Sequence, residues 1–214
     1  MSAPQQEIRF QKEIADFEAK DKRRPQPRGI ILFTGSSIFR FWTSLERDMY
    51  PLPVLNRAFG GARTWEVLHY MDRIVLPYKP KTIAYYCGSN DINFGASTED
   101  IFRCFKKFAD RAHEVLPKTN IFFVSIIKAP QKKDVWDAID TANDKIKTYC
   151  NPAAGLGFID VNPSFFTSQN HSRGELYMDD GLHFKPEAYR EMARIVKPVL
   201  ERSWQEAKDG TAEE

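Results

Sequence analysis

The feature of this sequence that most restricts its fold is a regular alternation of short apolar segments with longer amphipathic ones. Each apolar segment spans only a few residues, is rich in Ile, Leu, Val, Phe or Tyr, and lies between turn-forming residues. Runs of this kind are typical of strands that are buried on both faces of a parallel sheet. The predicted strands are residues 29–33, 53–55, 82–87, 120–126 and 157–161.

The segments between the predicted strands carry apolar residues at helical spacing. The clearest begins at Ser97, which forms a capping box with Asp100 and precedes one continuous apolar stripe as far as Val115. The alternation of strand and helix predicts an α/β fold class. We expect a three-layer α/β/α arrangement with a doubly wound, five-stranded parallel sheet of the flavodoxin-like type. Further helices are predicted at 38–47, around Val67, Met71 and Ile74, at 135–149 and at 186–204.

The N-terminal part of the chain lies outside this alternation. Residues 5–21 place Phe10, Ile14 and Phe17 at i, i+4 and i+7, which predicts an amphipathic helix. We expect this helix to pack on the body as a structural strap, followed by a basic, proline-containing linker. The predicted division of the chain is 1–28, the N-terminal helix and linker packing on the body, and 29–214, the main domain.

Three of the predicted strands are followed, where they end, by residues that can donate hydrogen bonds to a ligand. Ser37 lies in the turn after the first strand, Gly61 follows the second, and Asn90 follows the third. Because the ligand crevice of an open parallel sheet lies outside the carboxyl ends of its strands, these positions should converge on one edge. The backbone N–H groups of Ser37 and Gly61 and the side-chain amide of Asn90 are donors suited to an oxyanion.

A carboxylate and an imidazole stand three residues apart near the C-terminal end, as Asp180 and His183. A carboxylate that accepts from one ring nitrogen leaves the other free to take a proton from a hydroxyl, so this pair predicts a nucleophile elsewhere. Ser37 is the candidate nucleophile. The loop that carries the pair follows the fifth strand and can reach the same sheet edge. Together these residues favour a serine acyl hydrolase.

Each of these features is also common in proteins that use it only structurally. A Gly-Ser-Ser turn, a glycine pair, an Asn-Asp turn or an Asp-x-x-His motif alone is more often structural, and their joint occurrence favours catalysis. Other sites have little support. The segment after Gly35 lacks the final glycine of the usual nucleophile elbow, and neither the dinucleotide-binding G-x-G-x-x-G nor the P-loop motif occurs.

Composition describes an ordinary globular protein and argues against several classes of function. With 214 residues, 42% of them hydrophobic, the chain fits one domain, and a net charge of +2 gives no strongly basic face for nucleic acid. No run approaches the ~20 apolar residues of a membrane span, and none resembles a signal peptide. We therefore expect a cytoplasmic protein without stable membrane insertion. Its three cysteines lack disulfide or zinc-site spacing.

Four dispersed motifs of this kind, in this order, resemble the SGNH hydrolase superfamily, also called GDSL-type esterases and lipases. The likeness covers most of the chain from Gly29 onward, so that residues 29–214 resemble an SGNH hydrolase domain. Ser36 stands before the predicted nucleophile where the family name implies Asp, and Ala62 stands where many members carry Asp or Ser. The motifs are Gly35-Ser36-Ser37-Ile38, Asn56-Arg57-Ala58-Phe59-Gly60-Gly61, Gly88-Ser89-Asn90-Asp91 and Asp180-Gly181-Leu182-His183.

The resemblance implies hydrolysis of carboxylic esters through an acyl-enzyme, without a metal or organic cofactor. Carried over by position, it implies a catalytic triad of Ser37, Asp180 and His183 and an oxyanion hole of Ser37, Gly61 and Asn90. The expected partner is a small-molecule acyl ester, with short acyl chains favoured, and the oligomeric state is left open. Carbohydrate acetylesterase, lysophospholipase or thioesterase activity, or non-catalytic flavodoxin-like ligand binding, are the alternatives. Aromatic residues that could line the acyl site or belong to the core are Phe39, Phe41, Trp42, Trp65 and Phe94.

Overall fold

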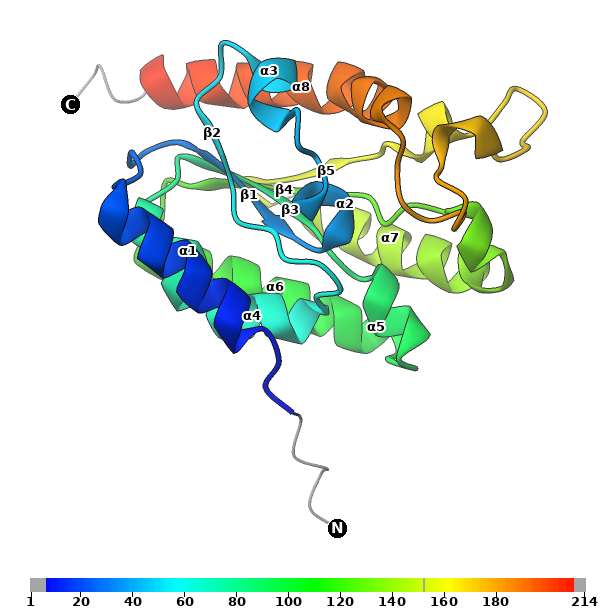
Figure 1. Cartoon of the computed structure of the whole chain (residues 1–214), viewed down its shortest axis with the longest axis horizontal. Coiled ribbons are helices and arrows are strands. Elements are labelled where there is room, and N and C mark those ends of the chain that lie inside the picture. Colours follow the sequence, from blue (N-terminus) through cyan, green and yellow to red (C-terminus); the bar gives the residue numbers. More distant parts are fainter. Residues whose placement is uncertain (1–6, 152, 210–214) are drawn as a thin grey trace.

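Five parallel strands form one sheet at the centre of the protein (Figure 1). The computed structural model describes residues 7–151 and 153–209. The strands are β1 (Ile31–Gly35), β2 (Val54–Asn56), β3 (Thr82–Tyr86), β4 (Asn120–Val124) and β5 (Leu156–Ile159). Their order in the sheet is β2-β1-β3-β4-β5, and every neighbouring pair is parallel. The predicted α/β fold with a five-stranded parallel sheet is therefore confirmed.

Helices connect the strands. The α-helices are α1 (Gln11–Arg23), α2 (Ser37–Arg40), α3 (Leu45–Met49), α4 (Thr64–Ile74), α5 (Ser89–Asn93), α6 (Thr98–Val115), α7 (Trp136–Cys150) and α8 (Pro186–Asp209). The 3-10 helices are η1 (Leu76–Tyr78), η2 (Pro130–Val135), η3 (Asn162–Phe165) and η4 (Gly174–Leu176). Within residues 7–151 and 153–209, no helix has both the length and the apolar character that a membrane crossing requires.

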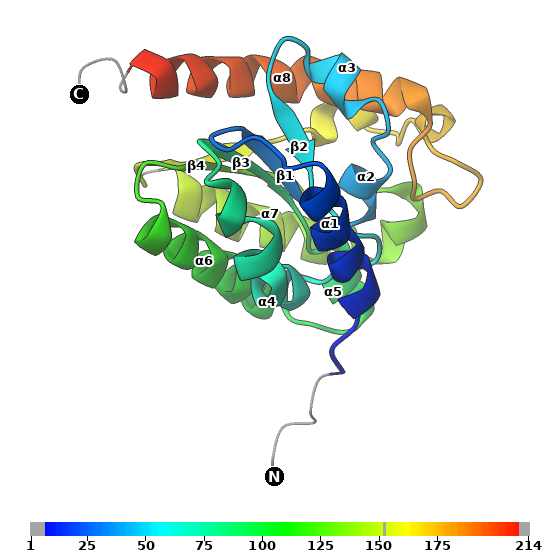
Figure 2. The ribbon, with the colours of Figure 1, turned by 60° about the vertical axis from the view of Figure 1, so that its left-hand side comes forward.

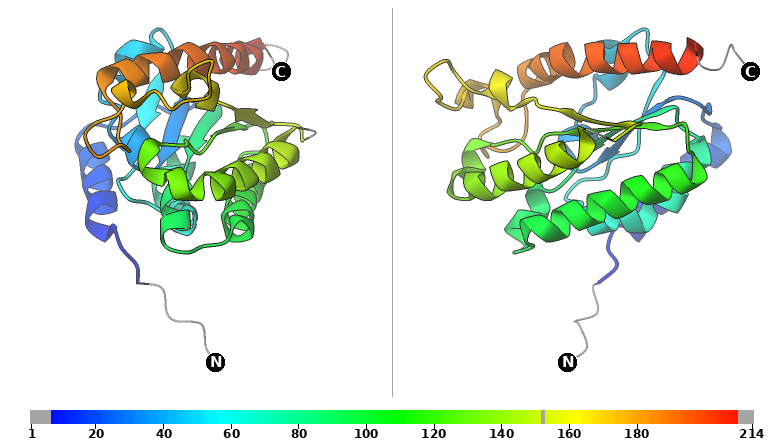
Figure 3. Two further views of the ribbon diagram at one scale, coloured as in Figure 1. Left: turned by 90° about the vertical axis from the view of Figure 1, so that its right-hand side faces the viewer. Right: turned by 180° about the vertical axis from the view of Figure 1, so that it is seen from behind.

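The helices cover both faces of the sheet, which gives the three predicted layers. α3 and α8 lie over one face, whereas α4, α6 and α7 lie over the other (Figure 3). α1 lies on the same side as α4 and packs against it (Figure 2). Helix α1 therefore adds to the layer that contains α4.

Alternate residues of β1 point into two separate hydrophobic cores. Leu32 belongs to the core beneath α1, α4, α6 and α7, where Tyr70 and Phe105 are fully covered. Ile31 and Phe33 belong to the core beneath α2, α3 and α8. Every residue of β1 is buried, as expected for a central strand covered on both faces.

The predicted helix 38–47 is wrong, since the structure has two short helices, α2 and α3, with a turn between them. Trp42 lies in that turn and is only 2% exposed because its ring enters the core. Its Nε1 donates to Asp48 Oδ2 at 2.8 Å, and the Ser44 hydroxyl donates to the same oxygen. Burial of Trp42 and these local bonds outweigh continuous helical hydrogen bonding.

The predicted helix 5–21 is also shifted. Helix α1 begins at Gln11 because Phe10 adopts the left-handed conformation, with φ of 68°, and α1 continues to Arg23. Residues 7–10 are therefore not helical, and residues 5 and 6 lie outside the described part of the chain.

The turn that leaves β1 depends on Gly35. Its φ is 132°, and a Cβ atom there would lie 1.8 Å from the backbone oxygen of Tyr86 on β3. Only glycine permits this approach. The next residue, Ser36, donates its backbone N–H to the same Tyr86 oxygen at 2.9 Å. The chain is thus held against β3 as it leaves the sheet, which fixes where α2 begins.

Candidate active site

Ser37 is the first residue of α2, directly beyond the carboxyl end of β1. The preceding residue, Ser36, has an extended backbone and is 2% exposed, whereas Ser37 is partly exposed. Of the two adjacent serines, Ser37 is therefore the one that reaches the surface. Because α2 is only four residues long, its dipole is small, and the local positive potential comes mainly from the free N–H groups of its first turn.

His183 lies between Ser37 and Asp180. Its Nε2 is 3.1 Å from Ser37 Oγ, and its Nδ1 is 2.6 Å from Asp180 Oδ2. Both distances fall in the hydrogen-bond range. The arrangement suits a neutral imidazole that donates from Nδ1 to the carboxylate and accepts the hydroxyl proton at Nε2. The structure thus brings together a serine and a histidine that are 146 positions apart in the chain.

The Asp180 carboxylate is held by the backbone of its own loop. Its Oδ1 accepts from the N–H groups of His183 and Leu182, each at 2.9 Å, and these two bonds lower the pKa of Asp180 to about 2. The side chain is 49% exposed, so directed hydrogen bonds and not burial set this pKa. Asp180 is therefore ionised at neutral pH and can fix the orientation of the His183 ring.

Two further contacts set the position of this loop. The Met178 N–H donates to the His183 carbonyl at 2.7 Å, and the Gln131 N–H donates to the Gly181 carbonyl at 3.0 Å. On α8, the buried Tyr189 hydroxyl donates to the Ile38 carbonyl at 2.9 Å. That last bond joins the helix that follows His183 to the helix that carries Ser37, so it fixes the separation of the two segments.

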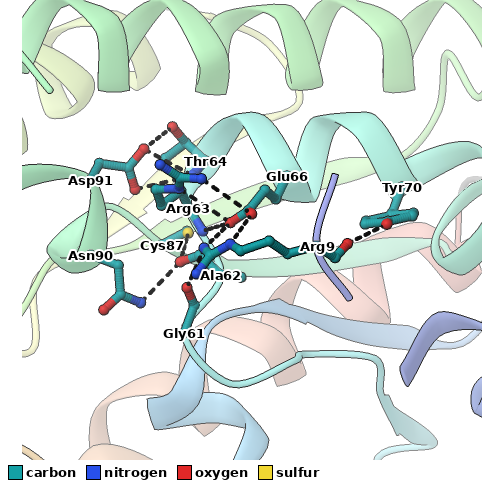
Figure 4. Close-up of polar contacts among 10 residues, drawn as sticks. All are labelled: Arg9, Gly61, Ala62, Arg63, Thr64, Glu66, Tyr70, Cys87, Asn90 and Asp91. Carbon is teal, nitrogen blue, oxygen red and sulfur yellow. Dashed lines mark hydrogen bonds and ion pairs between the residues drawn. The ribbon is translucent and has the colours of Figure 1, made fainter. Parts of the chain in front are cut away.

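Gly61 and Asn90 follow β2 and β3, the two strands that flank β1. Gly61 has φ of 77°, in the left-handed region that favours glycine. The Asn90 amide donates from Nδ2 to the Ala62 carbonyl at 3.0 Å (Figure 4). One amide hydrogen thus fixes the side chain, and its second hydrogen can donate to a ligand. The predicted donors therefore follow adjacent strands at one edge of the sheet.

A buried carboxylate joins the segments that carry Gly61 and Asn90. Asp91 is 3% exposed, and it accepts from both the N–H and the hydroxyl of Thr64, the first residue of α4 (Figure 4). Burial raises the pKa of Asp91 to about 6, although the bonds from Thr64 oppose the rise. This contact fixes the start of α4 relative to α5.

The five aromatic residues considered for the acyl site separate into two groups. Phe39 and Trp42 are covered core residues. Phe41 is about half exposed, Phe94 is more than half exposed, and Trp65 is half-buried. The ring of Phe41 lies 5.1 Å from that of His183, edge to face. Phe41 is therefore the aromatic residue of this set that contacts the candidate triad.

Several residues around the site were missed by sequence reasoning. Tyr189 sits on an apolar helix face and carries no local signal for its bond to Ile38. Glu66 stands at the third position of α4, where an acidic residue commonly caps a helix, and this signal could have identified it. Arg9, which pairs with Glu66 across 57 positions, has no local signal at all.

Residues 33–191 match the model of the GDSL-like lipase/acylhydrolase family. The chain belongs to this family. The matched segment contains every predicted site residue and does not include α1. Membership confirms the resemblance recognised from the four motifs, and it makes the chain a hydrolase of the GDSL type.

Several solved structures share the fold. A proposed acylhydrolase from Bacteroides fragilis NCTC 9343 has 18% identity and a TM-score of 0.79, with 92% of this chain and 99% of that chain covered. A GDSL-like lipase from Bacteroides thetaiotaomicron VPI-5482 has 19% identity and a TM-score of 0.76, with 89% and 98% covered. A carbohydrate esterase family 3 protein from Talaromyces cellulolyticus has 15% identity and a TM-score of 0.66, with 82% and 98% covered. None of the curated proteins compared with the chain matches it.

The buried Asp91 predicts a specific dependence of stability on pH. Its pKa of about 6 in the folded protein exceeds the ordinary 3.8, so folding favours the protonated acid. That contribution is complete below the ordinary pKa and is lost as the pH rises through about 6. Between pH 4 and 7, the free energy of unfolding should fall in the wild type relative to Asp91→Asn, by on the order of 3 kcal/mol.

Urea unfolding at intervals across this pH range measures the difference. Asp137→Asn, which removes an exposed carboxylate from α7, is the matched control and should follow the wild-type curve. Parallel curves for the wild type and Asp91→Asn would contradict the raised pKa of Asp91.

Proposed function

We propose that this hydrolase is a serine esterase that cleaves carboxylic esters through an acyl-enzyme on Ser37. The observation that carries the proposal is the series of hydrogen-bond distances from Ser37 Oγ through His183 to Asp180. Such a series supplies a nucleophile, a base and a group that orients the base. Its position, beyond the carboxyl ends of parallel strands, is also where this class of fold binds ligands.

In the first half of the reaction, Nε2 of His183 takes the proton of the Ser37 hydroxyl as Oγ attacks the ester carbonyl carbon. The carbonyl oxygen becomes an oxyanion, which accepts hydrogen bonds from the N–H groups of Ser37 and Gly61 and from the Asn90 amide. The ionised Asp180 stabilises the imidazolium. Collapse of the intermediate breaks the ester bond, and His183 gives its proton to the departing alcohol.

In the second half, a water molecule attacks the acyl-enzyme at the same carbonyl carbon while His183 accepts one of its protons. The same donors stabilise the second oxyanion. When the intermediate collapses, the bond to Ser37 Oγ breaks, the carboxylic acid leaves, and His183 returns the proton to Ser37. The partly exposed His183, at 29%, gives water access to the acyl-enzyme.

The surroundings of the site favour esters with short acyl chains as substrates. The half-exposed Asp180 and the partly exposed His183 place the reacting groups near the surface. The aromatic side chain in contact with the His183 ring, Phe41, is itself 50% exposed and offers a small apolar surface. An acyl group of a few carbons can cover that surface, whereas a long chain would extend into water.

The wild type should therefore hydrolyse p-nitrophenyl acetate, with kcat/KM falling as the acyl chain lengthens to octanoate. Ser37→Ala should reduce this turnover by at least ~10³-fold, because the nucleophile is lost. Ser36→Ala is the matched control, one residue away and buried, and should keep most of the activity. Circular dichroism checks that both variants fold. Equal rates for Ser37→Ala and the wild type would refute the mechanism, and a preference for octanoate would refute the substrate class.

The oxyanion role of Asn90 has a separate test. Asn90→Ala should lower kcat by ~10²-fold or more with little change in KM, because the bond to the oxyanion exists only in the transition state. Asn93→Ala, an exposed change in the same short helix, is the control. Steady-state kinetics on p-nitrophenyl acetate measures both. A raised KM with unchanged kcat for Asn90→Ala would mean that Asn90 binds ground-state substrate instead.

A further inference from the structure

A buried carboxylate lies directly behind the turn that carries Gly61. The Glu66 side chain is 0% exposed, and it accepts two hydrogen bonds from Arg9, from Nε and Nη2, each at 2.7 Å (Figure 4). It also accepts from the Arg63 N–H at 2.8 Å. Burial alone would raise the pKa of Glu66, but the bonds from the two arginines outweigh it and lower the pKa. Glu66 and Arg9 therefore form a bidentate ion pair.

The turn 61–64 is held almost entirely by side chains. Arg9 Nη2 donates to the Gly61 carbonyl at 3.3 Å, and Asn90 donates to the next carbonyl, that of Ala62. The next two N–H groups, of Arg63 and Thr64, donate to Glu66 and Asp91. In the described part of the chain, the Gly61 N–H makes no hydrogen bond of its own. The network thus fixes the turn directly after that N–H and leaves the N–H available to a ligand.

The N-terminal segment that contains Arg9 is itself anchored to the rest of the protein. The Arg9 carbonyl accepts from the Tyr70 hydroxyl on α4, and the next residue, Phe10, packs edge to face on Phe59 with ring centroids 5.0 Å apart. The Phe10 ring also lies 3.9 Å from where a Cβ of Gly61 would stand. The segment just before α1 therefore contacts the Gly61 turn through both a charged group and an apolar ring.

We propose that Arg9 is a positioning residue for the oxyanion donors, acting through Glu66 and the Gly61 carbonyl. This inference rests on the proposed esterase function. It assigns a role in the reaction to an N-terminal segment that precedes the family-matched residues 33–191. Without Arg9, the turn keeps Arg63 as a partner of Glu66, at 3.5 Å, and so stays folded but loses the bond that orients the peptide after Gly61. A displaced donor stabilises the oxyanion less, while ground-state binding is unchanged.

A matched pair of variants tests the proposal. Arg9→Met removes the bidentate pair with Glu66 while keeping side-chain length. Arg73→Met removes a second bidentate pair that joins the N-terminal part of the chain to α4, in which Arg73 on α4 donates to Glu18 on α1 at 2.7 and 2.8 Å. With p-nitrophenyl acetate, Arg9→Met should lower kcat by roughly 10- to 100-fold with KM within about twofold of wild type. Arg73→Met should change neither by more than about twofold.

Two further measurements separate positioning from general loosening of α1. Arg9→Lys, which keeps the charge but not the fork of donors, should fall between Arg9→Met and the wild type. In a Glu66→Gln background, Arg9→Met should have a smaller further effect on kcat than it has alone, because the two residues act together. Fully multiplicative losses would overturn the proposed action through Glu66.

Amide hydrogen exchange of the peptide that covers residues 58–64 provides a readout independent of chemistry. Arg9→Met should speed its exchange, and Arg73→Met should not. Unchanged kcat and unchanged exchange in Arg9→Met would overturn the inference, as would equal losses in both variants. A wild type without any esterase turnover would instead overturn the proposed function, and exchange alone would then show whether Arg9 holds the turn.

Discussion

Parallel pairing of β1 with both β2 and β3 is the constraint on which the site depends. It places the carboxyl ends of three strands side by side, so the residues that follow them share one edge of the sheet. Gly35 and Tyr86 are paired across β1 and β3, and the glycine lets the chain turn against β3 into α2. The partly exposed position of Ser37 is a consequence of this turn. The loop that follows β5 places His183 at the same edge of the sheet.

Buried carboxylates hold the part of the site that carries Gly61 and Asn90. The first turn of α4 presents N–H groups that lack helical partners, and two carboxylates accept them, Glu66 from Arg63 and Asp91 from Thr64. Burying a carboxylate is costly unless it is paired or hydrogen-bonded. Arg9 pairs with Glu66, whereas Asp91 has hydrogen bonds from Thr64 and a raised pKa. The geometry of the Gly61 turn is thus connected to the segment that precedes α1 on one side and to α5 on the other.

Much of this arrangement was predictable because strand ends are visible in the sequence. Short apolar runs predicted the positions of the five strands to within a few residues, and the residues that follow these runs gave Ser37, Gly61 and Asn90 as candidates. The contacts of Arg9 with Glu66 and of Tyr189 with Ile38 were not predictable, since apolar periodicity shows that a residue is buried but not which distant group it meets. The break at Trp42 was missed for the same reason: an aromatic ring inserted into the core overrode a helical pattern.

The proposed triad is tested most directly by the site at which a serine-reactive fluorophosphonate becomes attached. The probe reacts where a serine hydroxyl is activated by a base and its product is stabilised by oxyanion donors. Digestion of the labelled wild type, followed by mass spectrometry of the peptides, identifies the modified residue. We expect a single adduct on Ser37 that is lost in His183→Ala. An adduct on Ser36, or labelling that does not need His183, would contradict the proposed triad.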